Sequence, residues 1–124
     1  MLEQLEGIDV ELGMSYCMDD EDFYREVLEE YVNSDKSEEI EDLFNKGDWE
    51  NYRIKVHAVK STSLTIGAKE LYDEALQLEN ACKASDIDTI IDLHGCCMMD
   101  YKNVLDIVKN ALKAWSLRDI FGEV

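Results

Sequence analysis

Residues 47–86 read GDWENYRIKVHAVKSTSLTIGAKELYDEALQLENACKASD, and their apolar side chains recur at alternating steps of three and four. This spacing predicts one amphipathic helix over residues 48–66 and a second over residues 68–84. Gly47 and Gly67 mark the boundaries, and Asp48 can cap the first helix. The apolar stripes comprise Trp49, Tyr52, Val56, Val59, Ser63 and Ile66 in the first helix and Leu71, Ala75, Leu78 and Cys82 in the second.

Similar periodicity continues on both sides of this stretch. We expect a short helix over residues 10–16 capped by Asp9, one long helix over residues 20–46 with any kink near residues 33–36, and a last long helix beginning at Asp86. The seam of the last helix comprises Ile87, Ile90, His94, Cys97, Tyr101, Val104, Val108, Ala111 and Trp115, and Ile91, Met98, Leu105 and Leu112 widen it.

Long amphipathic segments joined by short turns must alternate in direction, so the predicted fold class is all-α. The expected architecture is an antiparallel up-down four-helix bundle with a short additional N-terminal helix. The expected domain is residues 8–115, with residues 1–7 and 116–124 as terminal extensions. The last stretch can extend the final helix, dock Ile120 and Phe121 on the bundle, or stay free.

The acidic composition restricts the classes of partner. Twenty-nine Asp and Glu against twelve Lys and Arg give a formal net charge of −17. This charge argues against nucleic acid and anionic lipid, which must be bound by basic groups, and it favours a monomer. No apolar run approaches the roughly 20 residues of a membrane helix.

The four cysteines indicate a reducing environment and no metal centre. Cys17, Cys82, Cys96 and Cys97 lack metal-knuckle spacing, and no secretory leader precedes them, so we expect a cytoplasmic protein with free thiols. Cysteines at helical core positions act as small apolar residues, and redox chemistry at Cys96–Cys97 is the alternative. We expect no metal site and no bound cofactor.

A row of polar residues lies beside the apolar stripe of the 48–66 helix. Arg53, His57, Lys60 and Leu64 follow one another at steps of four, three and four. We expect the His57 imidazole to stand in solvent beside an ammonium group, with no carboxylate facing it. A solvated helix face without function is the alternative interpretation.

Such a ring suits nucleophilic chemistry on an anionic group. Residues 51–68 hold three basic residues and no carboxylate. A neutral imidazole is a competent nucleophile at neutral pH, and Lys60 and Arg53 could partly neutralise an attached phosphoryl group. A ring enclosed by apolar side chains, or facing a carboxylate, would exclude this hypothesis.

The order of several short elements resembles the histidine-containing phosphotransfer (HPt) family over about residues 8–112. The family has a Gly-Asp turn, a helix bearing His-x-x-Lys, a Gly-Ala turn and a helix ending in a Leu-Glu-x-Ala motif. The upstream stretch IDVELGMSYCMDDEDFYREVLEEYV also resembles its first two helices. The matching elements are Gly47-Asp48, His57 to Lys60, Gly67-Ala68 and Leu78-Glu79-Asn80-Ala81.

The resemblance implies a role for each matching residue. His57 would be phosphorylated, Lys60 would stabilise the phosphate and Gly67 would permit the turn between helices. The donor would be a receiver-domain phospho-aspartate with its own Mg²⁺, and a second receiver would accept the group. Either receiver can be part of a hybrid histidine kinase. Ser61 replaces a glycine that the family usually has, and it could bind the phosphate or crowd the receiver.

The resemblance also implies a partly apolar docking surface around the histidine. Ala58 and Leu64 are the candidates for it, together with Tyr24 or Leu28 if these face outward.

Other functions have less support in the sequence. The absence of a Gly-rich phosphate cradle argues against ATP-dependent kinase activity. His94 falls on the seam of the last helix, which favours a buried histidine over a metal ligand with Cys97. The competing class is an adaptor, a helical bundle that binds a receiver or another signalling partner without phosphotransfer.

Overall fold

The computed structural model describes residues 4–122, and all regular structure within this range is helical. The all-α prediction is therefore confirmed. No described helix is both long enough and apolar enough to cross a membrane. The six helices are α1 (Val10–Tyr16), α2 (Glu21–Asn33), α3 (Ser37–Lys46), α4 (Trp49–Ile66), α5 (Lys69–Lys83) and α6 (Ile87–Phe121).

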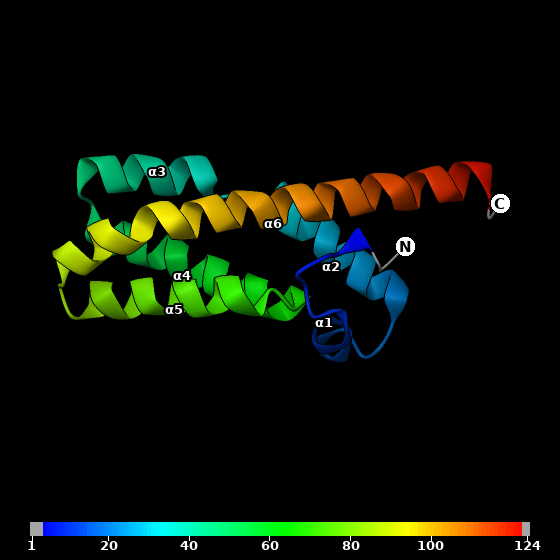
Figure 1. The fold of residues 1–124 in the computed structure, drawn as a ribbon, viewed down its shortest axis with the longest axis horizontal. Helices are drawn as coiled ribbons and strands as arrows, with labels where there is room; N and C mark the ends of the chain where they lie inside the picture. The colour runs from blue at the N-terminus through cyan, green and yellow to red at the C-terminus, as the bar shows by residue number, and fades with distance from the viewer. Residues whose placement is uncertain (1–3, 123–124) are drawn as a thin grey trace.

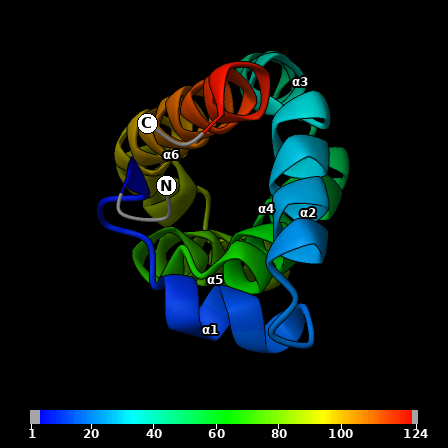
Figure 2. The same cartoon turned by 90° about the vertical axis from the view of Figure 1, so that its right-hand side faces the viewer.

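The longest helix, α6, runs the whole length of the molecule (Figure 1). The short Gly67–Ala68 turn joins α4 to α5, and these two helices pack on each other. Helix α5 also packs on α6. Helix α2 contacts both α6 and α4, so α2, α4, α5 and α6 contact one another in a closed ring (Figure 2). Helix α3 follows α2 in the chain and packs on α4 and α6.

The expected single helix over residues 20–46 is wrong, because the chain breaks after Asn33 and resumes at Ser37. Asp35 accepts a hydrogen bond from the Ser37 amide at 2.9 Å, and the Lys36 amide donates to the Tyr101 hydroxyl of α6 at 3.0 Å. These bonds replace the intrahelical bonds that a continuous helix would make. The apolar phase is similar on both sides of the break, which is why periodicity alone does not reveal it.

Helix α1 lies against the end of α4, where two glycines allow close backbone contact. Gly67 has φ +92°, and a Cβ there would lie 2.0 Å from the Asp9 carbonyl oxygen. A Cβ on Gly13 would lie 2.5 Å from the Ile66 carbonyl oxygen. Glycine is therefore required at position 67, both because φ is positive and because a Cβ would clash with the Asp9 backbone. The same contact fixes where α4 ends.

The described part of the N-terminal extension packs on the core. Leu5 is 3 % exposed and belongs to the core. At the other end, α6 continues through residue 121, and Ile120 and Phe121 stay exposed instead of docking. Residues 1–3 and 123–124 of the expected extensions lie outside the described range.

Most residues of the expected apolar stripes are buried in the core. The stripe of α4 is buried apart from its half-buried first residue, and the seam of α6 is largely buried, His94 included. The seam differs at its start, because Ile87 and Ile91 are exposed where α6 begins.

Candidate functional site

The His57 side chain stands at the surface of α4, and 56 % of it is exposed. The helix that carries it is well terminated: Asp48 accepts a hydrogen bond from the Asn51 amide, and Gly67 adopts the left-handed conformation at the other end. The ring is therefore held on a rigid element and reaches water, which an acceptor of a group from another protein requires.

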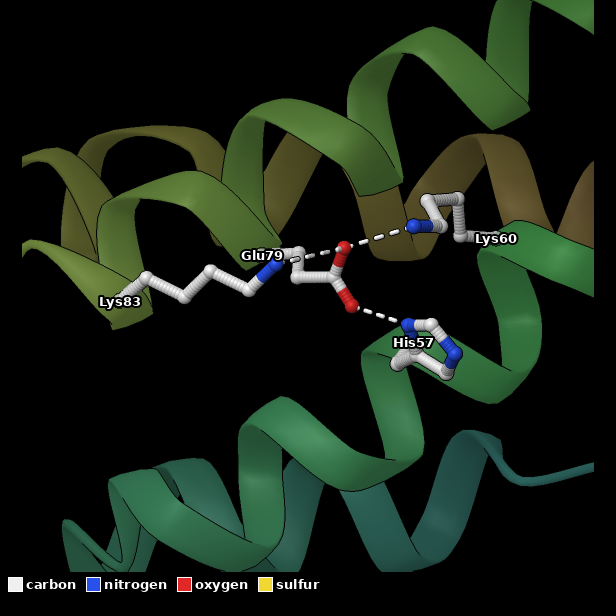
Figure 3. Close-up of polar contacts among 4 residues, drawn as sticks. All are labelled: His57, Lys60, Glu79 and Lys83. Carbon is white, nitrogen blue, oxygen red and sulfur yellow. Dashed lines mark hydrogen bonds and ion pairs between the residues drawn. The ribbon is translucent and has the colours of Figure 1, made fainter.

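The expectation that no carboxylate faces this ring is wrong. His57 Nδ1 donates a hydrogen bond to Glu79 Oε2 from α5 (Figure 3). Residues 51–68 contain no acid, and the carboxylate comes instead from the neighbouring helix, where it is only 1 % exposed. The site is thus built across the α4–α5 contact and not on one helix.

Two lysines offset the charge of this carboxylate. Lys60 Nζ donates to Glu79 Oε1 at 2.6 Å, and Lys83 Nζ lies 3.7 Å from the same oxygen (Figure 3). Burial alone would raise the pKa of Glu79, but the hydrogen bonds from Lys60 and His57 hold it below its ordinary value. Glu79 is therefore ionised at neutral pH, and one carboxylate with two ammonium groups leaves a net positive charge behind the ring.

The hydrogen bond also determines which nitrogen can react. Because Nδ1 of His57 donates to Glu79, the lone pair of the neutral ring lies on Nε2. Figure 3 shows Nε2 on the side of the ring away from Glu79. The arrangement can thus present an oriented, neutral nitrogen nucleophile.

The remaining predicted residues of α4 are distributed around His57. Ser61 is exposed, while Arg53, Ala58 and Leu64 are half-buried. Arg53 forms no ion pair with any residue in the range 4–122. Lys55, in contrast, pairs with Glu39 of α3 at 2.9 Å.

The docking candidates on α2 are excluded. Tyr24 and Leu28 are each 0 % exposed, and the Tyr24 hydroxyl donates to the Ile66 carbonyl at 2.8 Å. Both side chains belong to the core and cannot contact a partner.

Sequence reasoning did not assign a role to Glu79 or Lys83. A signal was present, because Glu79 follows Leu78 and lies four residues after Ala75, at the edge of the apolar stripe of α5. A carboxylate buried at such a position must be paired, since an unpaired buried charge is strongly unfavourable. Leu78-Glu79-Asn80-Ala81 was matched to the HPt family as a sequence motif only, with no role assigned to the Glu79 side chain.

His94, the other histidine, lies away from His57 in the core. His94 is 5 % exposed, its Nδ1 is 2.8 Å from the Tyr52 hydroxyl, and Phe44 stacks on its ring. The burial of this histidine agrees with the expected core position.

A second polar cluster, which joins α5 and α6, could hold a metal ion. Donor atoms of Glu74, Cys96 and Asp100 lie within 4.8 Å of one another. Burial, followed by the neighbouring Asp100 and Glu70, raises the pKa of Glu74 to about 7. All four cysteines are free, and Cys96 is exposed instead of packed in the core.

Comparison of the chain with protein-family models, with curated proteins and with solved structures gives no match.

Proposed function

We propose that this protein is a histidine phosphotransfer protein of a multistep phosphorelay. His57 would reversibly accept a phosphoryl group from a receiver-domain phospho-aspartate and pass it to another receiver. In this proposal the ring of helices is the antiparallel four-helix bundle of the HPt family, and the protein acts as a cytoplasmic monomer. The observation that supports it most directly is the exposed His57 ring, whose Nδ1 is held by the buried Glu79.

The chemistry follows from that hydrogen bond. Nε2 attacks the phosphorus atom, the N–P bond forms, and the P–O bond to the receiver aspartate breaks, so that the aspartate leaves as a carboxylate. The phosphorylated ring still holds its proton on Nδ1 and becomes positively charged. Glu79 stabilises that charge through the same hydrogen bond, and transfer to a second receiver reverses each step.

Glu79 faces the ring, although a facing carboxylate was expected to exclude a phosphoryl carrier. That expectation assumed an uncompensated negative charge near the incoming phosphoryl group. Here Lys60 and Lys83 offset the charge, and the carboxylate lies on the Nδ1 side of His57. Positioning and charge neutralisation supply most of the catalysis in phosphoryl transfer, and the cluster is suited to both.

The partner would supply what this chain does not. A receiver domain would bring the phospho-aspartate and Mg²⁺, so the proposal requires no metal or cofactor here. Arg53, one turn before His57, would add positive charge, and Ala58 and Leu64 would contact the receiver. Ser61 is exposed one turn after His57, where its hydroxyl can reach an attached phosphoryl group or the receiver.

The test is transfer of labelled phosphate from a phosphorylated receiver domain. We expect label that is acid-labile and alkali-stable, lost in His57→Gln, and slower to transfer or shorter-lived in Lys60→Ala. Lys55→Ala is the matched control, because this lysine pairs with Glu39 on another side of α4. Label that persists in His57→Gln would refute the site assignment, and unchanged kinetics in Lys60→Ala would make that lysine structural only.

The His57–Glu79 contact also supports the adaptor as a second candidate function. An ion pair between α4 and α5 can serve packing alone, with the imidazole unused. The adaptor interpretation predicts that a receiver domain binds the chain, that no receiver of the source organism transfers phosphate, and that His57→Gln changes stability only.

A further inference from the structure

A slot lies between α2 and α4, on the flank of α4 that begins at Ala58. Its walls come from α2, the α2–α3 junction, α4 and the Tyr101 side chain of α6. It has a volume of about 360 Å³ and follows α4 from Ala58 to Ile66, which corresponds to roughly 12 Å of helix. Pockets for small molecules have volumes of about 300–1,000 Å³ and often form between the helices of bundles. The slot has the size and the position of such a pocket.

The walls of the slot are mainly apolar. The rings of Tyr31 and Tyr101 form one part of them and stand edge to face, with their centroids 6.1 Å apart. Both side chains are buried, so packing holds the two rings in place. An apolar molecule gains free energy when it leaves water for such surroundings. The aliphatic part of the walls comes from α2 and α4 and comprises Val27, Ala58, Val59 and Ile66.

The Tyr101 hydroxyl brings a hydrogen-bond donor to these walls. Its oxygen accepts a bond from the Lys36 amide at 3.0 Å, and within residues 4–122 its own hydrogen has no acceptor. Burial raises the pKa of Tyr101 to about 12, so the hydroxyl keeps this hydrogen at neutral pH. Tyr101 and Lys36 both line the slot. A buried donor without an acceptor is unfavourable, and an acceptor atom of a ligand would remove that cost.

The charged residues of the slot favour an uncharged occupant. One acid, Glu30, and one base, Lys36, line it. Glu30 is exposed and accepts a hydrogen bond from Ser34 Oγ at 2.6 Å, while Lys36 is half-buried and forms no ion pair within the described range. The two charges have opposite signs, so the lining as a whole attracts neither anions nor cations. An ion would also lose hydration against the apolar walls.

The extent of the slot favours a small molecule over a protein surface. Eleven residues line it, whereas a standard protein–protein interface uses about 20–30 residues on each side. The Tyr101 side chain is only 2 % exposed, so an occupant must enter the slot to reach its hydroxyl. A compact ligand can do this and still be covered by the walls on several sides.

We propose that the slot between α2 and α4 binds an uncharged, largely apolar small molecule that carries a hydrogen-bond acceptor such as a carbonyl oxygen. The apolar part of the ligand would contact the aliphatic side chains of α2 and α4 and the two tyrosine rings. The acceptor would receive the hydrogen of the Tyr101 hydroxyl, which fixes how the ligand is oriented.

This slot is distinct from the candidate phosphotransfer site. His57 bonds to Glu79 of α5, whereas the slot lies between α4 and α2. The inference therefore does not rest on the proposed function, and its test measures binding without a phosphorylated partner.

The experiment compares three probes of similar shape. Benzophenone has two phenyl rings joined by a carbonyl group, and diphenylmethane has the same rings without the carbonyl oxygen. The third probe, 4-benzoylbenzoate, adds a negative charge to benzophenone. Binding of each probe is measured and mapped by amide chemical shifts of the full chain in two-dimensional NMR spectra.

We expect benzophenone to shift amides of the residues that line the slot and to bind at least about threefold more tightly than diphenylmethane, as one added hydrogen bond implies. The charged probe should bind more weakly than benzophenone. Tyr101→Phe should remove the preference for benzophenone and still bind diphenylmethane. The matched control Tyr52→Phe, which changes a buried tyrosine outside the slot, should keep the preference. Thr62→Leu, at an exposed position that lines the slot, should weaken binding of both uncharged probes; circular dichroism checks that each variant folds.

Several results would overturn the proposal. The absence of shifts, shifts away from the slot, or unchanged binding in Thr62→Leu would remove the site. Tighter binding of 4-benzoylbenzoate than of benzophenone, or an undiminished preference in Tyr101→Phe, would refute the uncharged acceptor bonded to this hydroxyl. Slot amides that shift with a purified receiver domain, but with neither uncharged probe, would assign the slot to a protein partner.

Discussion

Replacement of Glu79 by Gln tests the electrostatics of the candidate site directly, because it removes the buried charge and keeps the size of the side chain. Glu79 accepts hydrogen bonds from Lys60 Nζ and His57 Nδ1. A glutamine oxygen can accept one of them, and its NH₂ group must then face the other donor. The variant thus leaves one charged or polar donor without an acceptor.

The expected loss of stability follows from the exposure of the two donors. A hydrogen bond to a charged group contributes about 1.5–3 kcal/mol. Lys60 is 16 % exposed, so its bond retains most of this value, whereas His57 is 56 % exposed and water screens its bond strongly. We expect Glu79→Gln to lower the free energy of unfolding by about 2 kcal/mol, which shifts a urea midpoint by roughly 1 M at a slope of about 2 kcal/mol per molar.

The loss should depend on pH in a defined direction. The pKa of Glu79 lies below its ordinary value in the folded protein, because the bonds from Lys60 and His57 outweigh burial. Its contribution to stability is therefore complete above the unfolded pKa of about 4.3 and disappears as the pH falls through the lower folded value. The difference between the wild type and Glu79→Gln should close below that value.

The assay is urea unfolding followed by tryptophan fluorescence at several pH values. Asp73→Asn, an exposed acid of the same helix, is the control and should change stability by less than about 0.5 kcal/mol. A difference below about 1 kcal/mol at pH 7, or one that persists unchanged at low pH, would refute the assignment of Glu79 as a charged anchor of this cluster.

Three further predictions concern the fold. Gly67→Ala should lower the free energy of unfolding by at least about 2 kcal/mol, because φ is +92° and the added Cβ would clash with the backbone of Asp9. Gly95→Ala is the contrast: it lies within α6 with open space around it, so it should raise the free energy of unfolding by about 0.5–1 kcal/mol. Thermal unfolding of both variants measures the difference. Glu74→Gln should stabilise the protein more at pH 8 than at pH 5. With a folded pKa of about 7, the wild type loses stability as the pH rises from the unfolded pKa of about 4.3 to about 7, and the glutamine variant does not. Equal effects at both pH values would contradict the raised pKa. Tyr101→Phe should lower the free energy of unfolding by about 1–2 kcal/mol and speed hydrogen exchange of the Lys36 amide, because the Tyr101 hydroxyl accepts the hydrogen bond of that amide at 3.0 Å. Unchanged exchange would mean that this bond does not stabilise the α2–α3 junction.

Much of the helical structure could be predicted from local sequence. The bounds of α1, α4 and α5 agree with their expected ranges to within a residue or so, because glycines and capping aspartates act on the backbone beside them. The α2–α3 junction was expected only as a kink near residues 33–36 of one helix, and the complete break was not predicted. Besides the local bond between Asp35 and the Ser37 amide, the break involves the Tyr101 hydroxyl of α6, which lies 65 residues further along the chain.

The candidate site, too, could be predicted only in part from the sequence. Position on α4 alone determines that His57 lies beside the apolar stripe and that Lys60 follows one turn later, because both depend only on helical periodicity. The contact of His57 with Glu79 depends on how α5 is rotated and registered against α4, which the Gly67 turn and the packing of α1 on it fix. The sequence by itself therefore determined which residues share a helix face, and only the tertiary structure decided which charges meet across two faces, because that pairing arises from side-chain packing between helices and not from spacing within one.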